Sequence, residues 1–243
     1  MSVAPPLLAV ENLTKSYGGV HAVRGVSFSL QSGEILALIG PNGAGKSTCF
    51  DMLNGQNKPD TGQVRLLGEE TTGKKPREIW RLGVGRTFQI PQPFEKLTVF
   101  ENLVVAASMG SQKAESEVTD RCAEILVNTG LIERANALAG GLGLLQRKRL
   151  ELARALATDP KLLLLDEIAG GLTEAECISL IETIRTIHAS GITIVWIEHV
   201  LHALNAVVQR LLVLNFGKVV DIGTPEAMMA SSAVREIYLG LEV

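Results

Sequence analysis

The sequence predicts an α/β fold in which helices alternate with buried strands. Residues 161–165 and 192–197 are near-continuous apolar runs of strand length, typical of strands buried on both faces of a parallel sheet. A helical segment lies between them and opens with the capping-box spacing of Thr173 and Glu176. A third apolar run, residues 35–39, leads directly into a glycine-rich loop. We therefore expect a parallel sheet covered by helices.

Local signals place the other elements in order along the chain. Glycine-rich turns and apolar runs predict further strands at residues 7–10, 26–30, 63–67 and 84–88, and a hairpin at 211–215 and 218–222. A helix is expected over residues 47–54, and Thr224 with Pro225 opens a terminal helix. From 98 to about 157 the apolar period becomes helical, with a surface connection at 110–117. The helical stretch predicts a subdomain inserted into the α/β part.

The composition narrows the class of protein. Hydrophobic residues make up 46% and charged residues 20%, as in soluble globular proteins. The net charge of −3 lacks the excess of positive charge that is typical of proteins that bind nucleic acid. Cys49, Cys122 and Cys177 are widely spaced, which favours reduced thiols and no metal framework. No apolar run reaches the roughly 20 residues of a membrane span, and residues 1–10 lack the layout of a signal peptide. We expect a cytoplasmic protein that reaches a membrane only through other subunits.

A phosphate-binding pattern follows the apolar run at residues 35–39. Glycines let the backbone wrap around an anion, so that N–H groups and the next helix's N-terminus face it. Lys46 is expected to reach the β- and γ-phosphates, and the Ser47 hydroxyl to bind Mg²⁺. The implied ligand is a nucleoside triphosphate. The pattern G-x-x-x-x-G-K-[ST] and its neighbour comprise Gly40, Pro41, Asn42, Gly43, Ala44, Gly45, Lys46, Ser47 and Thr48.

Two acids close the apolar run that ends at residue 165. Asp166 and Glu167 follow the phosphate loop in the sequence, at the spacing expected of the acidic motif that lies on the Mg²⁺ side of such a loop. Asp166 is expected to coordinate Mg²⁺, usually through water, and Glu167 to polarise the attacking water. A solvated strand end would be the alternative for an isolated acid pair, but the phosphate loop favours the catalytic interpretation.

With Tyr17, Gln89 and His199 added in order, the chain resembles the ATP-binding cassette (ABC) ATPases over essentially its whole length. The resemblance implies a P-loop NTPase (RecA-like) core with an N-terminal antiparallel β-subdomain, and ATP with Mg²⁺ as cofactors. It divides a single domain into a nucleotide-binding core, residues 1–90 and 158–243, and a helical subdomain, residues 91–157. No internal repeat is present, so the chain carries one cassette.

The resemblance also implies residue roles. Tyr17 would stack on adenine, Gln89 would contact Mg²⁺ and the attacking water, and His199 would hydrogen-bond the γ-phosphate and orient Glu167. Each has a structural alternative: Tyr17 as packing, Gln89 as a surface amide, and His199 as a core histidine. Their joint order along the chain favours the functional interpretation.

The signature loop departs from the family pattern L-S-G-G-Q. Counting back from residues 153–156 aligns it with 142–146, in which Gly143 replaces serine and Leu145 replaces a glycine. Gly143 and Gln146 would face the ATP of the opposite subunit. A side chain at position 145 adds bulk where backbone must come close. Residues 138–142 offer a second alignment, shifted by about one helical turn.

Residues 85–89 (G-R-T-F-Q) and 97–103 resemble the ATPases of branched-chain amino-acid importers. That resemblance implies membrane permease subunits, a second ATPase subunit, a periplasmic solute-binding protein as indirect partner, and a place on the inner face of the cell membrane. Residues 90–102, with Phe94 and Leu97 as anchors, are expected to accept a permease helix or to form a hinge packed on its own core. The altered signature favours a heterodimer, with a homodimer as the alternative.

Other functions remain in competition. Lipopolysaccharide- or lipid-export ATPases share much of the pattern, and an ATP-gated dimerising module with weak hydrolysis would tolerate the altered signature loop. Translation-factor and DNA-repair ABC proteins carry a second cassette or a long coiled-coil insertion, which this chain lacks. A nucleoside kinase has no need of Gln89 and His199. The favoured prediction is an ATPase that powers an importer.

Overall fold

The computed structural model describes residues 5–111, 115–198, 204 and 207–239. The chain forms two compact units, Met1–Leu82 with Thr193–Val243, and Gly83–Ile192. The elements of the first unit are β1 (Leu8–Tyr17), β2 (Val20–Leu30), β3 (Ile35–Ile39), α1 (Lys46–Leu53), β4 (Thr61–Leu66), β5 (Glu69–Glu70), α2 (Pro76–Arg81), β8 (Thr193–Ile197), β9 (Arg210–Asn215), β10 (Lys218–Gly223), α8 (Pro225–Ala230) and α9 (Ser232–Leu239). Those of the second are β6 (Val84–Arg86), α3 (Val99–Ser111), α4 (Glu115–Asn128), η1 (Ile132–Arg134), η2 (Ala139–Gly141), α5 (Leu144–Ala157), β7 (Leu162–Asp166) and α6 (Glu174–Ala189).

Two sheets organise the first unit. The N-terminal strands form an antiparallel sheet of order β2-β1-β4-β5, which confirms the predicted antiparallel β-subdomain. In the other sheet β3 lies between β8 and β9 and runs parallel to both, while β10 pairs with β9 as the predicted hairpin. All five residues of β3 are buried, because its run of apolar side chains covers both faces. The predicted α/β class is confirmed.

The two N-terminal strands are longer than the sequence predicted. The expected strands ended at residue 10 and began at residue 26, whereas β1 continues to Tyr17 and β2 begins at Val20. Register irregularities explain both errors: one between Val10 and Leu13, with Asn12 at φ 49°, interrupts β1, and another between Leu13 and Thr14 skips Gly25 of β2. Such a bulge places two successive residues on the exposed side, so the alternation that identifies a strand breaks while the strand itself continues.

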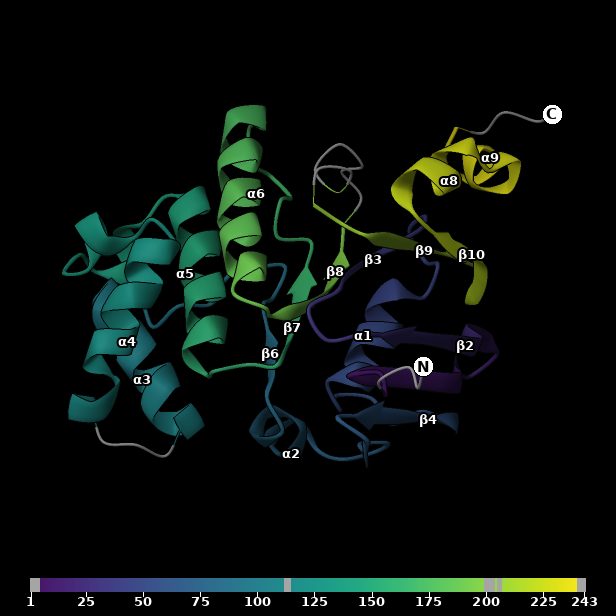
Figure 1. The fold of residues 1–243 in the computed structure, drawn as a ribbon, viewed down its shortest axis with the longest axis horizontal. Helices are drawn as coiled ribbons and strands as arrows, with labels where there is room; N and C mark the ends of the chain where they lie inside the picture. Colours follow the sequence, from purple (N-terminus) through teal and green to yellow (C-terminus); the bar gives the residue numbers. More distant parts are fainter. Residues whose placement is uncertain (1–4, 112–114, 199–203, 205–206, 240–243) are drawn as a thin grey trace. The chain divides into compact units, whose positions relative to one another are not determined.

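Helices α3, α4 and α5 pack against one another in the second unit and are drawn in teal in Figure 1. Their apolar faces are buried, with Leu103, Leu126 and Leu150 at 0% exposure. The connection predicted at residues 110–117 was too long, because α3 runs to Ser111 and α4 begins at Glu115. Residues 110–117 are polar or small, so the sequence shows no apolar period that would mark the helix ends. In the same unit β6 pairs in parallel with β7, which is buried throughout.

Replacing Thr173 with alanine tests the predicted cap of α6. Its hydroxyl accepts from the N–H of Glu176, and the Glu176 carboxylate accepts from the Thr173 N–H at 2.9 Å, which lowers the pKa of Glu176 below 4.5. We expect Thr173→Ala to lower the free energy of unfolding by about 1 kcal/mol. The lowered pKa means that the carboxylate's stabilisation is present at neutral pH and lost as pH falls below 4.5.

Denaturant unfolding at pH 7 measures the loss of unfolding free energy in Thr173→Ala. The same measurement at acid pH shows how much of that loss remains when the Glu176 carboxylate is protonated. Thr186→Ala, at an exposed threonine of the same helix, serves as the control and should cost less at pH 7. An equal cost for both variants at neutral pH would contradict the capping role of Thr173.

Candidate nucleotide site

The phosphate loop joins β3 to α1 in the first unit. Gly45 is the N-cap of α1 at φ 101°, and Lys46 is the first helical residue. The Lys46 side chain is 7% exposed, and its Nζ donates to the carbonyls of Gly40 at 2.8 Å and Pro41 at 3.1 Å. The loop therefore wraps around the ammonium of its own lysine, which holds the charge at the start of the helix.

Two glycines of this loop have no room for a side chain. A Cβ at Gly40 would stand 2.2 Å from the carbonyl oxygen of Leu214, and one at Gly45 would stand 2.3 Å from that of Ala22. Both also have positive φ, which L-residues rarely adopt. Glycine at these positions thus allows the loop to lie against β2 and β9.

The N-terminus of α1 suits a phosphate group. Its first turn contains no acidic residue, Ser47 is exposed, and Thr48 is half-buried. Unpaired N–H groups and the helix dipole attract an anion at such a terminus, and the ammonium of Lys46 adds a full positive charge. The glycine-containing phosphate loop, the N-terminus of α1 and the ammonium of Lys46 together fit the triphosphate of a nucleotide.

Tyr17 ends β1 in the same unit. Its side chain is 46% exposed, and the Nζ of Lys15 lies 5.6 Å from the ring centroid. The exposed ring has a face available for stacking, in keeping with the expected contact with adenine. That contact stays a prediction.

Gln89 and Glu167 meet in the second unit. Glu167 follows the last residue of β7 with φ 44°, a left-handed conformation uncommon outside glycine. The side-chain amide of Gln89 donates to its Oε2. The sequence predicted both residues near the attacking water but not their direct hydrogen bond, which orients the carboxylate.

Asp166 forms a buried ion pair with Arg86, which the sequence analysis did not assign to the site. Arg86 Nη2 lies 2.9 Å from Asp166 Oδ2, and the two side chains are 8% and 12% exposed. The Asp166 N–H also donates to the Thr87 hydroxyl at 3.2 Å. The parallel pairing of β6 with β7 sets Arg86 opposite Leu164, two residues before Asp166. The predicted metal ligand is thus already held by a cation.

Lys148 of α5 is a second residue that the sequence analysis missed. Its side chain is 3% exposed, and Nζ donates to the main-chain carbonyl of Glu167 at 3.3 Å. The N–H of Gly170 donates to the same oxygen at 3.2 Å. These bonds hold the main chain at Glu167 in its left-handed conformation. A lysine two positions after Gln146 carries no sequence signal for this contact.

The signature loop precedes α5. Gly143 is the N-cap of this helix, and its N–H donates to the side-chain oxygen of Gln146 at 3.4 Å. The second alignment falls instead on the short 3₁₀ turn η2. Arg147 donates to the carbonyls of Gly140 at 2.7 Å and Leu142 at 2.9 Å and so braces the loop. The helix start favours the alignment on residues 142–146, and contact with a second subunit stays a prediction.

His199 lies outside the described residues. Among the residues that the structure does describe, no cluster of three or more His, Cys, Asp or Glu side chains is arranged to hold a metal ion. No described helix is both long and apolar enough to cross a membrane.

Comparison with known proteins decides the family. The family model described as "ABC transporter" matches residues 23–170, which include the phosphate loop, Gln89, Asp166 and Glu167. The chain belongs to the ABC transporter family. Membership assigns to it ATP binding and an ATPase activity coupled to transport, and it implies membrane-embedded partner subunits.

ABC proteins of known name match the chain over nearly its full length. The high-affinity branched-chain amino acid transport ATP-binding protein LivG of Salmonella typhimurium is 39% identical, covering 98% of this chain and 99% of that protein. LivG of Escherichia coli is 38% identical with the same coverage. BraF of Pseudomonas aeruginosa, described in the same words, is 36% identical and covers 97% and 98%.

Solved ABC structures agree with the fold. The ADP conformation of an ATP-binding cassette of an ABC transporter matches with a TM-score of 0.89 and 31% identity, covering 98% of this chain and 100% of that one. A nucleotide-free ATP-binding cassette matches with a TM-score of 0.87 at the same identity and coverage. The predicted P-loop core with its inserted helical subdomain is therefore confirmed.

Proposed function

We propose that this ABC protein is the ATP-hydrolysing subunit of an importer for branched-chain amino acids or related small solutes. The observation that supports the substrate class best is the 39% identity to LivG across 98% of the chain. The contact between Gln89 and Glu167 supports hydrolysis, because it fixes the carboxylate that would polarise the attacking water.

The phosphate loop and its neighbours would bind the nucleotide. Lys46 and the N–H groups of residues 40–48 would hold the phosphates, and Tyr17 would stack on adenine. His199 would contact the γ-phosphate. Gly143 and Gln146 would complete the ATP site of an opposing subunit. Residues 1–90 and 158–243 would form the nucleotide-binding core of a single ABC domain, with 91–157 as its helical subdomain.

Mg²⁺ is the metal that the donor atoms fit. The hydroxyl of Ser47, the amide oxygen of Gln89 and the carboxylate of Asp166 are oxygen ligands, which Mg²⁺ prefers. We assign these three residues to it, together with phosphate oxygens. When bound, Mg²⁺ would neutralise charge that develops on the phosphates. Arg86 would then share Asp166 with the metal.

The altered signature loop supports a heterodimer. In an ABC dimer each chain supplies its phosphate loop and Glu167 to one site and its signature loop to the other. Gly143 lacks the serine hydroxyl, and Leu145 adds a side chain near a backbone donor, which would cost on the order of 1 to 3 kcal/mol of phosphate contact. A second ATPase subunit with an intact signature would retain one good site built on Lys46 and Glu167.

The same loop favours one second candidate, an ATP-gated dimerising module with weak hydrolysis. Such a module would bind ATP and dimerise without supporting solute uptake. A lipid exporter is the remaining alternative within the family, and it would give no amino-acid uptake.

The permease is proposed to dock on residues 90–102, and the part that precedes α3, residues 90–97, is named here the docking segment. Phe94 is 47% exposed and Ile90 72% exposed, although both are large apolar residues. A few apolar anchors of this kind dominate the binding of a helix in a groove. The docking surface would place the chain at the inner face of the cell membrane, where a periplasmic solute-binding protein acts on it only through the permease.

Cysteine crosslinking tests this docking. We expect Phe94→Cys to crosslink to the membrane subunit, because the anchor lies against the partner. Background reaction should be low, since Cys49, Cys122 and Cys177 are all buried. Ile178→Cys is the matched control, an apolar residue 55% exposed on α6. The absence of a crosslink from position 94 in every nucleotide state would instead support a hinge packed on its own core.

Solute uptake tests the proposed function as a whole. Proteoliposomes that hold the complete transporter should accumulate radiolabelled leucine, isoleucine or valine when ATP is enclosed on the side of this chain. Lysine and glucose should not accumulate. ATP-dependent uptake of none of the three branched-chain amino acids would contradict the substrate class.

A further inference from the structure

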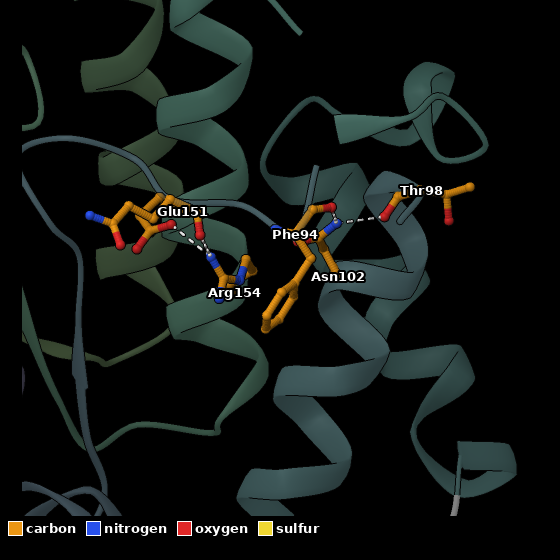
Figure 2. Close-up of polar contacts among 6 residues, drawn as sticks. Phe94, Thr98, Asn102, Glu151 and Arg154 are labelled. Atoms are coloured by element: carbon orange, nitrogen blue, oxygen red, sulfur yellow. Dashed lines mark hydrogen bonds and ion pairs between the residues drawn. The ribbon is translucent and has the colours of Figure 1, made fainter. Parts of the chain in front are cut away.

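The docking segment is bound by side chains from two helices of the same unit. Residues 91–94 form neither helix nor strand, so their main-chain groups need other hydrogen-bond partners. Figure 2 shows those partners arriving from α3 on one side and from α5 on the other. The two attachments differ in chemistry.

Asn102 makes the attachment to α3. Its side chain is fully buried, accepts from the N–H of Phe94 at 2.9 Å, and donates to the carbonyls of Phe94 at 3.1 Å and Thr98 at 2.8 Å. The amide thus binds Phe94 as a neighbouring strand would. This attachment is neutral and local, since Asn102 lies only eight residues from Phe94.

An ion pair makes the attachment to α5. Arg154 Nη1 donates to the carbonyl of Gln92 at 2.8 Å and to Glu151 Oε2 at 3.0 Å. The Gln92 N–H acts on the Glu151 carboxylate to lower its pKa. The guanidinium also lies 5.0 Å from the centroid of the Phe94 ring. One pair of side chains, Glu151 and Arg154, therefore holds the main-chain carbonyl of Gln92 and interacts with its N–H, and this pair is called here the α5 clamp.

The α5 clamp is a costly way to stabilise a fold. Glu151 is 6% exposed, and burial raises the pKa of its carboxyl, while Arg154 and the Gln92 N–H act in the opposite direction. Apolar residues of similar volume commonly stabilise such a position as well as a buried ion pair does, or better. Apolar residues cannot supply the directed hydrogen bond from Arg154, which fixes the position of the Gln92 carbonyl on the helix.

Helix α5 also carries the signature loop at its start. The clamp lies in its C-terminal half, and Gly143 caps its N-terminus. A helix of this length is rigid over about 20 Å. A displacement of the docking segment that the clamp transmits would therefore move the signature end of the same helix.

We propose that Glu151 and Arg154 are positioning residues that lock the docking segment to α5, so that permease movement and signature-loop movement are one motion. The inference rests on the proposed function, because it takes the membrane subunit as the partner on the docking segment. Without the clamp, the permease would still bind, but ATP hydrolysis and solute movement would lose their coordination.

The variant that isolates the clamp is Glu151→Leu with Arg154→Met. It removes the contacts with Gln92 and takes away both charges together, so no unpaired charge stays buried and the fold should persist. In the isolated chain, the Gln92 amide should exchange its hydrogen at least about tenfold faster, while the Phe94 amide, bound by Asn102, changes less. The single variant Arg154→Lys, which keeps Glu151 and a positive charge, should retain part of the protection that the double variant loses at the Gln92 amide. Unchanged exchange at Gln92 would overturn the clamp.

Coupling is measured in the complete transporter as leucine taken up per ATP hydrolysed. We expect this ratio to fall about tenfold in the double variant, while the ATPase rate of the isolated chain stays within about twofold of the wild type and its thermal midpoint does not fall. Arg185→Met is the matched control, because it breaks an exposed Arg–Glu pair of the same i,i+3 spacing on α6. The control should keep the wild-type ratio.

Two results would overturn the coupling role. One is an unchanged uptake-to-ATP ratio in a double variant that has lost Gln92 protection. The other is an equal fall in the ATPase of the isolated chain, which would make the clamp a structural support of hydrolysis. A Leu97→Cys crosslink to the membrane subunit is recorded in parallel. If Leu97→Cys in an otherwise wild-type chain gives no crosslink, the proposed docking itself fails. If it gives the crosslink and the double variant keeps the uptake-to-ATP ratio, only the clamp's coupling role fails.

Discussion

Replacing Glu167 with glutamine is expected to leave ATP bound and to slow its hydrolysis by roughly 10²- to 10⁴-fold. The amide keeps the shape of the carboxylate and an oxygen that can accept from Gln89, so the local structure should survive. It cannot polarise water as a carboxylate does. The chain should therefore accumulate as an ATP-bound dimer. Steady-state ATP turnover of the assembled complex measures the first effect. Sedimentation of the ATPase subunits with ATP, in the absence of the permease, measures the second.

Glu174→Gln is the control for this change. Glu174 is an exposed acid in the first turn of α6, in the same unit as Glu167, so its replacement alters the charge equally. Turnover of the control should match the wild type. Undiminished turnover in Glu167→Gln would remove Glu167 from the catalytic role.

The same substitution also tests the unequal sites of the proposed heterodimer. The good site combines Lys46 and Glu167 of this chain with the partner's signature loop, so Glu167→Gln should depress turnover more than the equivalent change in the partner. Equal effects of the two substitutions would contradict inequality of the sites. So would a fully active transporter in which this chain forms a homodimer.

Replacing Lys46 with alanine is expected to weaken ATP binding by about 10- to 100-fold. Hydrogen bonds to charged groups contribute about 1.5–3 kcal/mol, and the ammonium of Lys46 is the full positive charge of the phosphate loop. The fold should persist, because Gly40 and Gly45 keep the loop against β9 and β2. Equilibrium titration with a fluorescent ATP analogue measures the affinity.

Lys218→Ala provides the comparison for Lys46→Ala. Lys218 is an exposed lysine on β10 of the same unit, so the variant changes the net charge by the same amount. It should bind the analogue as the wild type does. Normal binding by Lys46→Ala would count against the phosphate loop as the nucleotide site.

The sequence predicted those parts of the fold that local signals determine. The strand before the phosphate loop, the acid pair at the end of β7 and the cap at Thr173 each depend on residues close together in the chain. The bulge at Asn12 was missed because it breaks the alternation from which a strand is inferred. The extended helices α3 and α4 were missed where their ends are polar.

The contacts that hold the proposed catalytic side chains could not be predicted from the sequence. Arg86 lies 80 residues from Asp166, and Lys148 lies 19 residues from Glu167. Whether an arginine or a lysine faces a carboxylate, a carbonyl or water depends on the packing of β6, β7 and α5 against one another. The α5 clamp has the same origin, since 62 residues separate Arg154 from Gln92. No spacing rule brings such pairs together.

The central claim, that this ABC protein hydrolyses ATP to drive import, is tested most directly by comparing ATP turnover of the complete transporter with that of the isolated chain. Turnover is measured with and without leucine-loaded solute-binding protein. We predict a low rate for the isolated chain, and a rate in the complex that leucine-loaded binding protein raises severalfold and Glu167→Gln abolishes. A complex whose ATP turnover is no faster than that of the isolated chain and does not respond to leucine, isoleucine or valine would contradict the claim.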